Sequence, residues 1–248
     1  MADLEIASSV KLPEGKGRRI LVTRPQPAAA RTARLLQEAG FIADVFPLTQ
    51  TQALSPKVEM LDYVAVTATS INAFRHADPA LLESLKHLPL FAVGVRTAEV
   101  AREYGFQTVI EGGGDAVRLA QTIAAHLPPQ AHIIYLAGRV RQPVFEERVH
   151  TTGIIMQVYD IYDTVATNVQ PDAIINQPYA AVLLYSGVAA SSLISVQEKT
   201  PAPLFQASVK FFCIAPRVAE LLPEHWKNNS FSADHPDENG IFRLFQHI

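Results

Sequence analysis

An internal repeat is the sequence feature that most constrains the fold of this chain. Residues 90–99, LFAVGVRTAE, recur in altered form as residues 211–220, FFCIAPRVAE. Each copy begins with an apolar run too short for a core helix, passes a turn at Gly94 or at Ala215-Pro216, and continues with helical spacing. The repeat therefore predicts one strand–turn–helix unit that the chain uses twice.

Two further pairs of similar stretches occur in the same order along the chain, so the first match is not isolated. Residues 62–70 parallel residues 179–186, and residues 118–123 parallel residues 243–248. The copies lie more than a hundred residues apart, far longer than the unit of a solenoid repeat. We therefore interpret the chain as two similar α/β domains.

Composition is typical of a soluble globular protein. The 248 residues suffice for two modest domains that each bury a core, and 48% of them are hydrophobic and 18% charged. The longest uncharged stretch, residues 173–197, is broken at residues 176–178 and 186–187, so no membrane-spanning helix is expected. Residues 1–17 lack a secretory pattern and are expected to form a flexible tail, which indicates a cytoplasmic protein.

Charge, cysteine and glycine patterns exclude several classes of site. The formal net charge of −3 argues against general nucleic-acid binding, although a local basic cleft stays open. The one cysteine, Cys213, is interpreted as a buried structural thiol rather than a reactive nucleophile. The eight histidines form no metal-ligand spacing, and residues 112–114 follow neither the dinucleotide nor the P-loop pattern. No metal and no organic cofactor are expected.

Strands and helices are expected to alternate, which predicts doubly wound parallel sheets with helices on both faces. The expected strands are residues 19–23, 41–46, 62–67, 90–93, 106–110, 133–136, 154–159, 180–184, 209–214 and 229–232. Expected helices end near residues 39, 104 and 126 and cover residues 144–152, 171–176, 187–196, 216–222 and 238–247.

The second half of the chain lacks an equivalent of the opening strand–helix–strand at residues 19–46. Residues 18–48 would supply it, which makes the first domain discontinuous. We expect a first domain of residues 1–48 and 165–248 and an inserted second domain of residues 49–164. Residues 47–52 and 160–164 would cross between them as a two-stranded connection.

Hydroxyl residues and arginines follow several expected strands, at the edge where open parallel sheets bind ligands. They are Thr69, Ser70, Thr97, Ser186, Arg24, Arg139 and Arg141. The hydroxyls and nearby helix N-termini could hold carboxylates, and plain helix capping is the alternative. The arginines could bind anions, with surface solvation as the alternative.

Five stretches, in their order and spacing, resemble the uroporphyrinogen-III synthase family over nearly all of residues 19–248. They are residues 21–25 (LVTRP), 69–73 (TSINA), 93–98 (VGVRTA), 136–139 (LAGR), and Gly153 followed by residues 162–164 (YDT). The resemblance implies a cyclising hydro-lyase of tetrapyrrole and heme biosynthesis. Such an enzyme converts hydroxymethylbilane to uroporphyrinogen III with loss of water and inversion of ring D, without a cofactor. The resemblance also implies two α/β domains joined by a two-stranded connection. We expect a monomer that binds no nucleic acid and no membrane.

The resemblance also assigns roles to residues. Tyr162 matches the tyrosine that assists departure of the substrate hydroxyl, although Tyr159 competes for this role and either could be a packed strand aromatic. Thr97 matches a threonine of the family's cleft. The expected substrate-binding residues are Thr97, Thr69, Ser70, Ser186, Arg24, Gly138, Arg139 and Arg141. Arg24 is expected to face Arg139 and Arg141 across a cleft.

Two residues depart from the family pattern in the second repeat. Ala215 stands where members commonly have glycine, and Val218 stands where they commonly keep a threonine. Both changes remove polar or close-approach capacity. The alternative function is therefore a non-catalytic relative of the synthase that binds an anionic ligand or serves a regulatory role.

Overall fold

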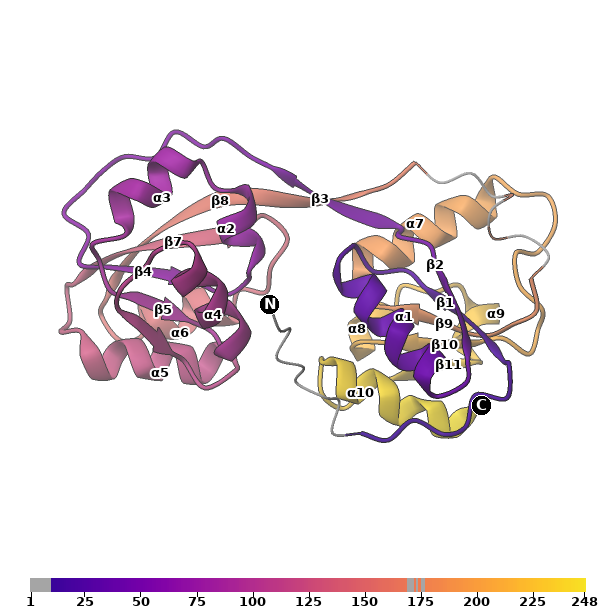
Figure 1. The fold of residues 1–248 in the computed structure, drawn as a ribbon. Coiled ribbons are helices and arrows are strands. Elements are labelled where there is room, and N and C mark those ends of the chain that lie inside the picture. The colour runs from indigo at the N-terminus through magenta and orange to yellow at the C-terminus, as the bar shows by residue number, and fades with distance from the viewer. Residues whose placement is uncertain (1–9, 169–171, 173, 175–176) are drawn as a thin grey trace. The chain divides into compact units, whose positions relative to one another are not determined.

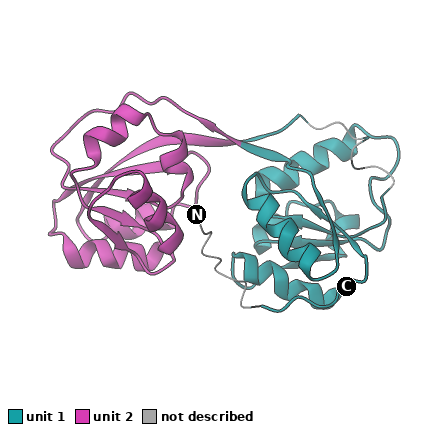
Figure 2. Ribbon diagram, viewed as in Figure 1, with its two compact units in different colours: residues 1–50, 165–248 teal, residues 51–164 magenta. Residues whose placement is uncertain are grey.

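The computed structural model describes residues 10–168, 172, 174 and 177–248 (Figure 1). Contacts divide the chain into two compact units, shown in Figure 2. Unit 1 comprises residues 1–50 and 165–248, and unit 2 comprises residues 51–164. Each unit has its own sheet and its own core.

The described residues of unit 1 form a parallel sheet in the strand order β11-β10-β9-β1-β2. Its strands are β1 (Arg19–Val22), β2 (Ile42–Val45), β9 (Tyr179–Leu184), β10 (Lys210–Cys213) and β11 (Ser230–Ser232). The central strands β1 and β9 end in the apolar runs 20–22 and 181–184, which are fully buried. Continuous apolar runs are typical of parallel strands that helices cover on both faces.

Two of the helices of unit 1 begin at residues whose side chains cap them. The helices of this unit are α1 (Ala28–Glu38), α7 (Gly187–Glu198), α8 (Pro216–Ala219), α9 (Glu224–Lys227) and α10 (Glu238–Arg243), followed by the 3-10 helix η2 (Leu244–His247). Ser186 caps α7 and Asp237 caps α10, each by accepting a backbone N–H.

Two of the expected helices of unit 1 differ in the structure. The helix expected at residues 216–222 is the short α8, because Pro223 cannot continue the helical hydrogen bonding and precedes the separate α9. The helix expected at residues 238–247 tightens into a 3-10 turn after Arg243. The helix expected near residues 171–176 falls largely outside the described residues.

The described residues of unit 2 form a sheet in the order β3-β8-β7-β4-β5-β6. Its strands are β3 (Thr49–Ala53), β4 (Ala65–Ala68), β5 (Leu90–Ala92), β6 (Val109–Glu111), β7 (His132–Gly138) and β8 (Ile155–Ala166). Strands β4 to β8 are parallel neighbours. The segments expected as crossovers, residues 47–52 and 160–164, lie mostly within β3 and β8.

Strand β3 runs antiparallel to β8. The Leu54 N–H donates to the Ile161 carbonyl at 2.7 Å, and the Thr167 N–H donates to the Leu48 carbonyl at 3.0 Å. Residue numbers therefore rise along one strand as they fall along the other. These two segments are where the chain passes from one unit to the other.

The helices of unit 2 are α2 (Asn72–His76), α3 (Pro79–Leu85), α4 (Val95–Glu103), α5 (Ala116–His126) and α6 (Val144–His150). Asp78 and Asp115 cap α3 and α5. Helices α2 and α3 were not expected from the sequence, because helices of five and seven residues are too short to display a helical period.

Residues of unit 2 alternate between two cores, one on each face of the sheet. Val66 and Ile134 pack in one cluster, whereas Ala65 and Ile133, their neighbours in sequence, pack in the other. This alternation places apolar helices on both faces. The expected α/β class with parallel sheets is confirmed.

Two other expectations can be compared with the described residues. Cys213 is buried, and burial raises the pKa of its thiol to about 12, so it packs as a structural thiol. No helix in the described part of the chain is both long enough and apolar enough to cross a membrane.

The two sheets share one strand order. Read from the edge, unit 1 has β11-β10-β9-β1-β2 and unit 2 has β6-β5-β4-β7-β8, with β3 added. After β1 the chain continues toward one edge of its sheet, and after β9 it continues toward the other edge. In unit 2 the chain likewise continues toward opposite edges after β7 and after β4. Such reversal points are where open α/β sheets bind ligands, at the carboxyl ends of the strands.

Candidate functional site

The reversal point of unit 2 brings together four residues that the sequence singled out. Thr69 and Ser70 follow β4, Gly138 ends β7, and Tyr162 lies on β8 opposite Gly138, just after a shift in register. A Cβ atom at Gly138 would lie 2.5 Å from Cζ and 2.7 Å from the hydroxyl oxygen of Tyr162. The phenol ring therefore lies against the bare Cα of Gly138, and any side chain there would displace it.

The surroundings of Tyr162 keep its phenol protonated. Burial raises the pKa of this half-buried tyrosine, while a hydrogen bond with the Ser70 side chain and the charge of Arg141 partly oppose the rise. The hydroxyl is consequently a hydrogen-bond donor throughout the neutral pH range. The competing residue, Tyr159, differs: its hydroxyl accepts the Glu59 N–H at 3.0 Å and is therefore already bonded to the backbone.

A second phenol, that of Tyr135 on β7, adds a hydroxyl next to that of Thr69. Its oxygen lies 2.6 Å from Oγ1 of Thr69, and burial raises its pKa to about 12. Its ring packs edge-on against Phe145, with ring centroids 5.0 Å apart. Tyr135 was not expected in the site, because it lies inside an apolar strand and has the sequence surroundings of an ordinary core residue.

His76, on the short helix α2, stacks on Tyr162. The ring centroids are 5.8 Å apart with 30° between the planes, and His76 Nε2 lies 2.8 Å from Oγ1 of Thr51. Burial, and to a lesser degree the charge of Arg75, lower the pKa of His76, which favours the neutral ring. No sequence pattern pointed to this residue, because α2 was not expected.

Thr97 occupies the first turn of α4 with little exposure. Its side chain is 6% exposed, and no hydrogen bond of its hydroxyl to another described residue is found; because no buried polar side-chain atom in the described residues lacks a partner, this oxygen is open to solvent. The first N–H groups of a helix also lack intrahelical partners and attract anions. A carboxylate at this turn could satisfy both the hydroxyl and the backbone.

The two arginines of unit 2 are paired with carboxylates. Arg141 donates to Asp160 at 2.6 Å and to Glu146 at 2.5 Å, whereas Arg139 donates to Asp163 at 3.0 Å. Arg139 is 55% exposed against 25% for Arg141, so Arg139 exchanges partners more easily. The pairing was not expected from the sequence, which suggested free anion-binding groups or solvated ones.

These arginines also border a cavity of about 500 Å³ in unit 2. Its lining consists of Leu54, Ser55, Pro56, Arg139, Arg141, Val158, Tyr159 and Asp160. Its charged lining consists of two arginines and one aspartate, so positive charge is in excess.

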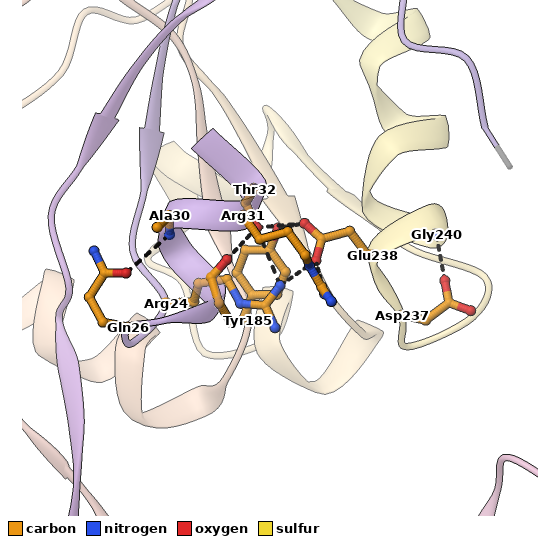
Figure 3. Close-up of polar contacts among 10 residues, drawn as sticks. Arg24, Gln26, Ala30, Arg31, Thr32, Tyr185, Asp237, Glu238 and Gly240 are labelled. Carbon is orange, nitrogen blue, oxygen red and sulfur yellow. Dashed lines mark hydrogen bonds and ion pairs between the residues drawn. The ribbon is translucent and has the colours of Figure 1, made fainter. Parts of the chain in front are cut away.

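The reversal point of unit 1 is arranged differently (Figure 3). Arg24 follows β1, and its guanidinium carbon lies 4.2 Å from the ring centroid of Tyr185, which follows β9. Its Nη1 donates to Oε2 of Glu238 at 2.5 Å. Ser186 accepts the Ala189 N–H at 3.1 Å, so it caps α7. That Arg24 faces the arginines of unit 2 stays a prediction.

The departures in the second repeat have unequal consequences. Ala215 has an extended backbone with φ of −161°, which any residue adopts, so glycine is not required there. Val218 is the third residue of α8, as Thr97 is of α4, and it is fully buried. Unit 1 therefore has a methyl group where unit 2 has a hydroxyl.

Comparison with known proteins assigns the family. Residues 30–243 match the family model described as uroporphyrinogen-III synthase HemD. The fold is similar to that of uroporphyrinogen-III synthetase from Helicobacter pylori, with a TM-score of 0.65 and 15% identity over 93% of this chain and 99% of that one. A mutant uroporphyrinogen III synthase from the extremely thermophilic bacterium Thermus thermophilus gives a TM-score of 0.50 and 15% identity over 93% and 98%. A search of curated protein sequences finds no significant match. Because the family model spans most of the sequence, the chain belongs to the uroporphyrinogen-III synthase family.

Proposed function

We propose that this protein is a uroporphyrinogen-III synthase, which cyclises hydroxymethylbilane to uroporphyrinogen III with loss of water and inversion of ring D. The observation that carries the proposal is the placement of Tyr162 in a chain of this family. Its protonated phenol lies against Gly138 and beside Ser70, at the reversal point of unit 2. We expect a cytoplasmic monomer that works without a cofactor.

In the first step, Tyr162 assists departure of the substrate hydroxyl. The carbon–oxygen bond breaks with its electron pair on oxygen, and the adjacent pyrrole N–H gives up its proton, so water leaves and an azafulvene remains. The Tyr162 hydroxyl donates a hydrogen bond to the departing oxygen. Acid assistance of this kind contributes roughly 10²–10⁴-fold in rate.

In the second step, the protein orients ring D so that its substituted carbon attacks the azafulvene. The bond from that carbon to its methylene bridge with ring C then breaks, and the freed methylene bonds to the other α-carbon of ring D, which loses its proton, so ring D is inverted. Holding two reacting groups together can supply on the order of 7–11 kcal/mol, which makes orientation the larger contribution. The solvent-open hydroxyl of Thr97, the first turn of α4 and the hydroxyls of Thr69 and Ser70 are suited to hold substrate carboxylates. The Arg139 side chain can join them by releasing Asp163.

The test is incubation of the protein with freshly prepared hydroxymethylbilane, followed by separation of the isomers. Spontaneous closure gives the type I isomer, so formation of type III supports the proposal. Tyr162→Phe should reduce the rate of type III formation, and Tyr159→Phe is the matched control that should leave it close to wild type.

A second candidate is a non-catalytic relative that binds an anionic ligand. The buried Val218, in the place of a threonine, is the observation that favours it. Type I as the sole product, together with retained binding of a polycarboxylate, would overturn the synthase proposal in favour of this candidate.

A further inference from the structure

The carboxylate of Glu238 in unit 1 receives hydrogen bonds from four of the described side chains (Figure 3). Its Oε2 accepts from Arg24 at 2.5 Å and from Arg31 at 3.2 Å. Its Oε1 accepts from Thr32 at 2.6 Å and from Tyr185 at 3.3 Å. Both oxygens of one carboxylate are therefore held by a convergent set of donors.

These donors come from the elements that meet at the reversal point of the sheet. Arg24 follows β1, Tyr185 follows β9, and Arg31 and Thr32 lie on α1, whereas Glu238 reaches in from the start of α10. Ligands of open α/β sheets bind at this position. Two guanidinium groups and two hydroxyls have the chemistry that recognises a carboxylate.

The donor set does not require Glu238 itself. The Ala28 carbonyl lies 3.1 Å from Oγ1 of Thr32, so the single hydroxyl hydrogen of Thr32 has a second acceptor when Glu238 leaves. Arg24 keeps its packing on the Tyr185 ring whichever carboxylate it binds. The cap of α10 is independent of Glu238, because Asp237 accepts the Gly240 N–H at 2.7 Å.

Charge and exposure favour exchange with an outside anion. Two arginines face one carboxylate, which leaves the cluster with an excess positive charge. The Glu238 side chain is 15% exposed and that of Arg31 is 52% exposed, so solvent reaches the edge of the cluster. Arg24 holds Glu238 through Nη1, which leaves Nε and Nη2 able to contact a larger anion.

We propose that Arg24, Arg31, Thr32 and Tyr185 form a carboxylate-binding site, and that Glu238 occupies it until a carboxylate of the ligand displaces it. The identity of that ligand, a polycarboxylate tetrapyrrole, rests on the proposed function. Glu238 then makes binding through unit 1 selective, because a weak single anion cannot compete with a tethered carboxylate.

The proposal is tested by calorimetric titration of the full chain with citrate, a polycarboxylate that undergoes no reaction. Glu238→Gln removes the resident charge while keeping the shape, and it should bind citrate about tenfold more tightly than wild type, since the site no longer has to be vacated. Glu224→Gln is the matched control, because Glu224 is an exposed residue of the same unit and its replacement changes the net charge equally. Arg24→Gln combined with Glu238→Gln should abolish the gain.

The proposal is overturned if Glu238→Gln binds citrate with the same affinity as Glu224→Gln, or more weakly than the wild type. Glu238 would then belong to a fixed structural ion pair with Arg24. Thermal melting establishes that each variant is folded. If Glu238→Gln does not fold, Glu238→Asp replaces it: the shorter side chain withdraws the carboxylate from Tyr185, and citrate should bind a few-fold more tightly. The outcome is independent of catalysis, because the citrate titration and the isomer assay can each fail while the other succeeds.

Discussion

The two units have the same strand order but differ in the hydroxyl groups near their reversal points. In unit 2, Thr97 keeps a hydroxyl without a partner among the described residues, and Tyr162 is held as a protonated donor. In unit 1, the equivalent of Thr97 is Val218, and Arg24 is paired with Glu238 from its own unit. The difference lies in the hydroxyls, because arginines of both units are paired with carboxylates of their own unit, Arg24 with Glu238 and Arg139 with Asp163.

The largest effect is expected for Gly138→Ala. The added methyl group would lie 2.5 Å from the Tyr162 ring, so the ring must leave its position. We expect the rate of type III formation to fall at least about 10²-fold, the range of acid assistance. The double variant Gly138→Ala with Tyr162→Phe should be no slower than the slower single variant, because both act on one group. Additive losses would show that Gly138 acts elsewhere.

Replacing one arginine of each unit separates binding from stability. Arg24→Ala breaks a partly buried ion pair and should lower the free energy of unfolding by about 2 kcal/mol, between the values for exposed and buried pairs. Arg139→Ala, at an exposed side chain, should change it by less than about 0.5 kcal/mol. Denaturant unfolding measures both. Equal losses in the two variants would contradict the contrast between the units.

The same pair of variants tests how substrate carboxylates are bound. Both should raise KM more than they lower kcat, because contacts to carboxylates hold substrate and transition state alike. The KM of the wild type should also rise with salt, since charge attraction is screened beyond about 8 Å at physiological ionic strength. A KM that is flat with salt and unchanged in both variants would assign binding to backbone amides alone.

Exchanging the third residues of α4 and α8 tests the hydroxyl directly. Thr97→Val should raise KM about threefold, the lower range for one hydrogen bond, because the backbone N–H groups of the helix remain. Val218→Thr buries a new hydroxyl and should lower the free energy of unfolding by about 1–3 kcal/mol. If Thr97→Val alters stability instead of KM, the Thr97 hydroxyl serves the fold and not the ligand.

The smallest expected effect is the pH dependence that His76 confers. Its pKa in the folded state lies below the unfolded value of 6.5, so the unfolded state binds the proton more readily. Stability that is present above pH 6.5 should therefore decline as the pH falls through this value toward the folded pKa. His76→Gln should lose this part of the decline, as measured by Tm between pH 7.5 and about 5. Parallel curves for the two proteins would show that partial burial does not keep His76 neutral.

Strand ends were predictable from the sequence, and so was much of the unit 2 site. Apolar runs followed by small polar residues identify where β4, β7 and their helices meet, which brought Thr69, Ser70 and Gly138 into consideration. The sequence favoured Tyr162 over Tyr159 for the catalytic role, and that assignment stays a prediction. The sequence could not show that the Tyr159 hydroxyl is bonded to the backbone.

Contacts between distant segments could not be predicted. Glu238 lies 214 residues from Arg24, and no local pattern marks it as the partner of an arginine. His76 lies on a helix of five residues, too short for a periodic signal, and it reaches Tyr162 only through the folding of β8. Sequence periodicity therefore predicts helices and strands but not the side chains that reach a site from a distant element.

The most direct test of the account compares kcat and Tm for Tyr162→Phe and Tyr185→Phe. Each variant removes one phenol oxygen, one at each reversal point. We expect Tyr162→Phe to lower kcat for type III formation by about 10²-fold with little change in Tm. Tyr185→Phe should keep most of kcat and lower Tm by a few degrees, because Glu238 loses a donor. The reverse pattern, with kcat lost in Tyr185→Phe and kept in Tyr162→Phe, would contradict the assignment of the chemistry to unit 2.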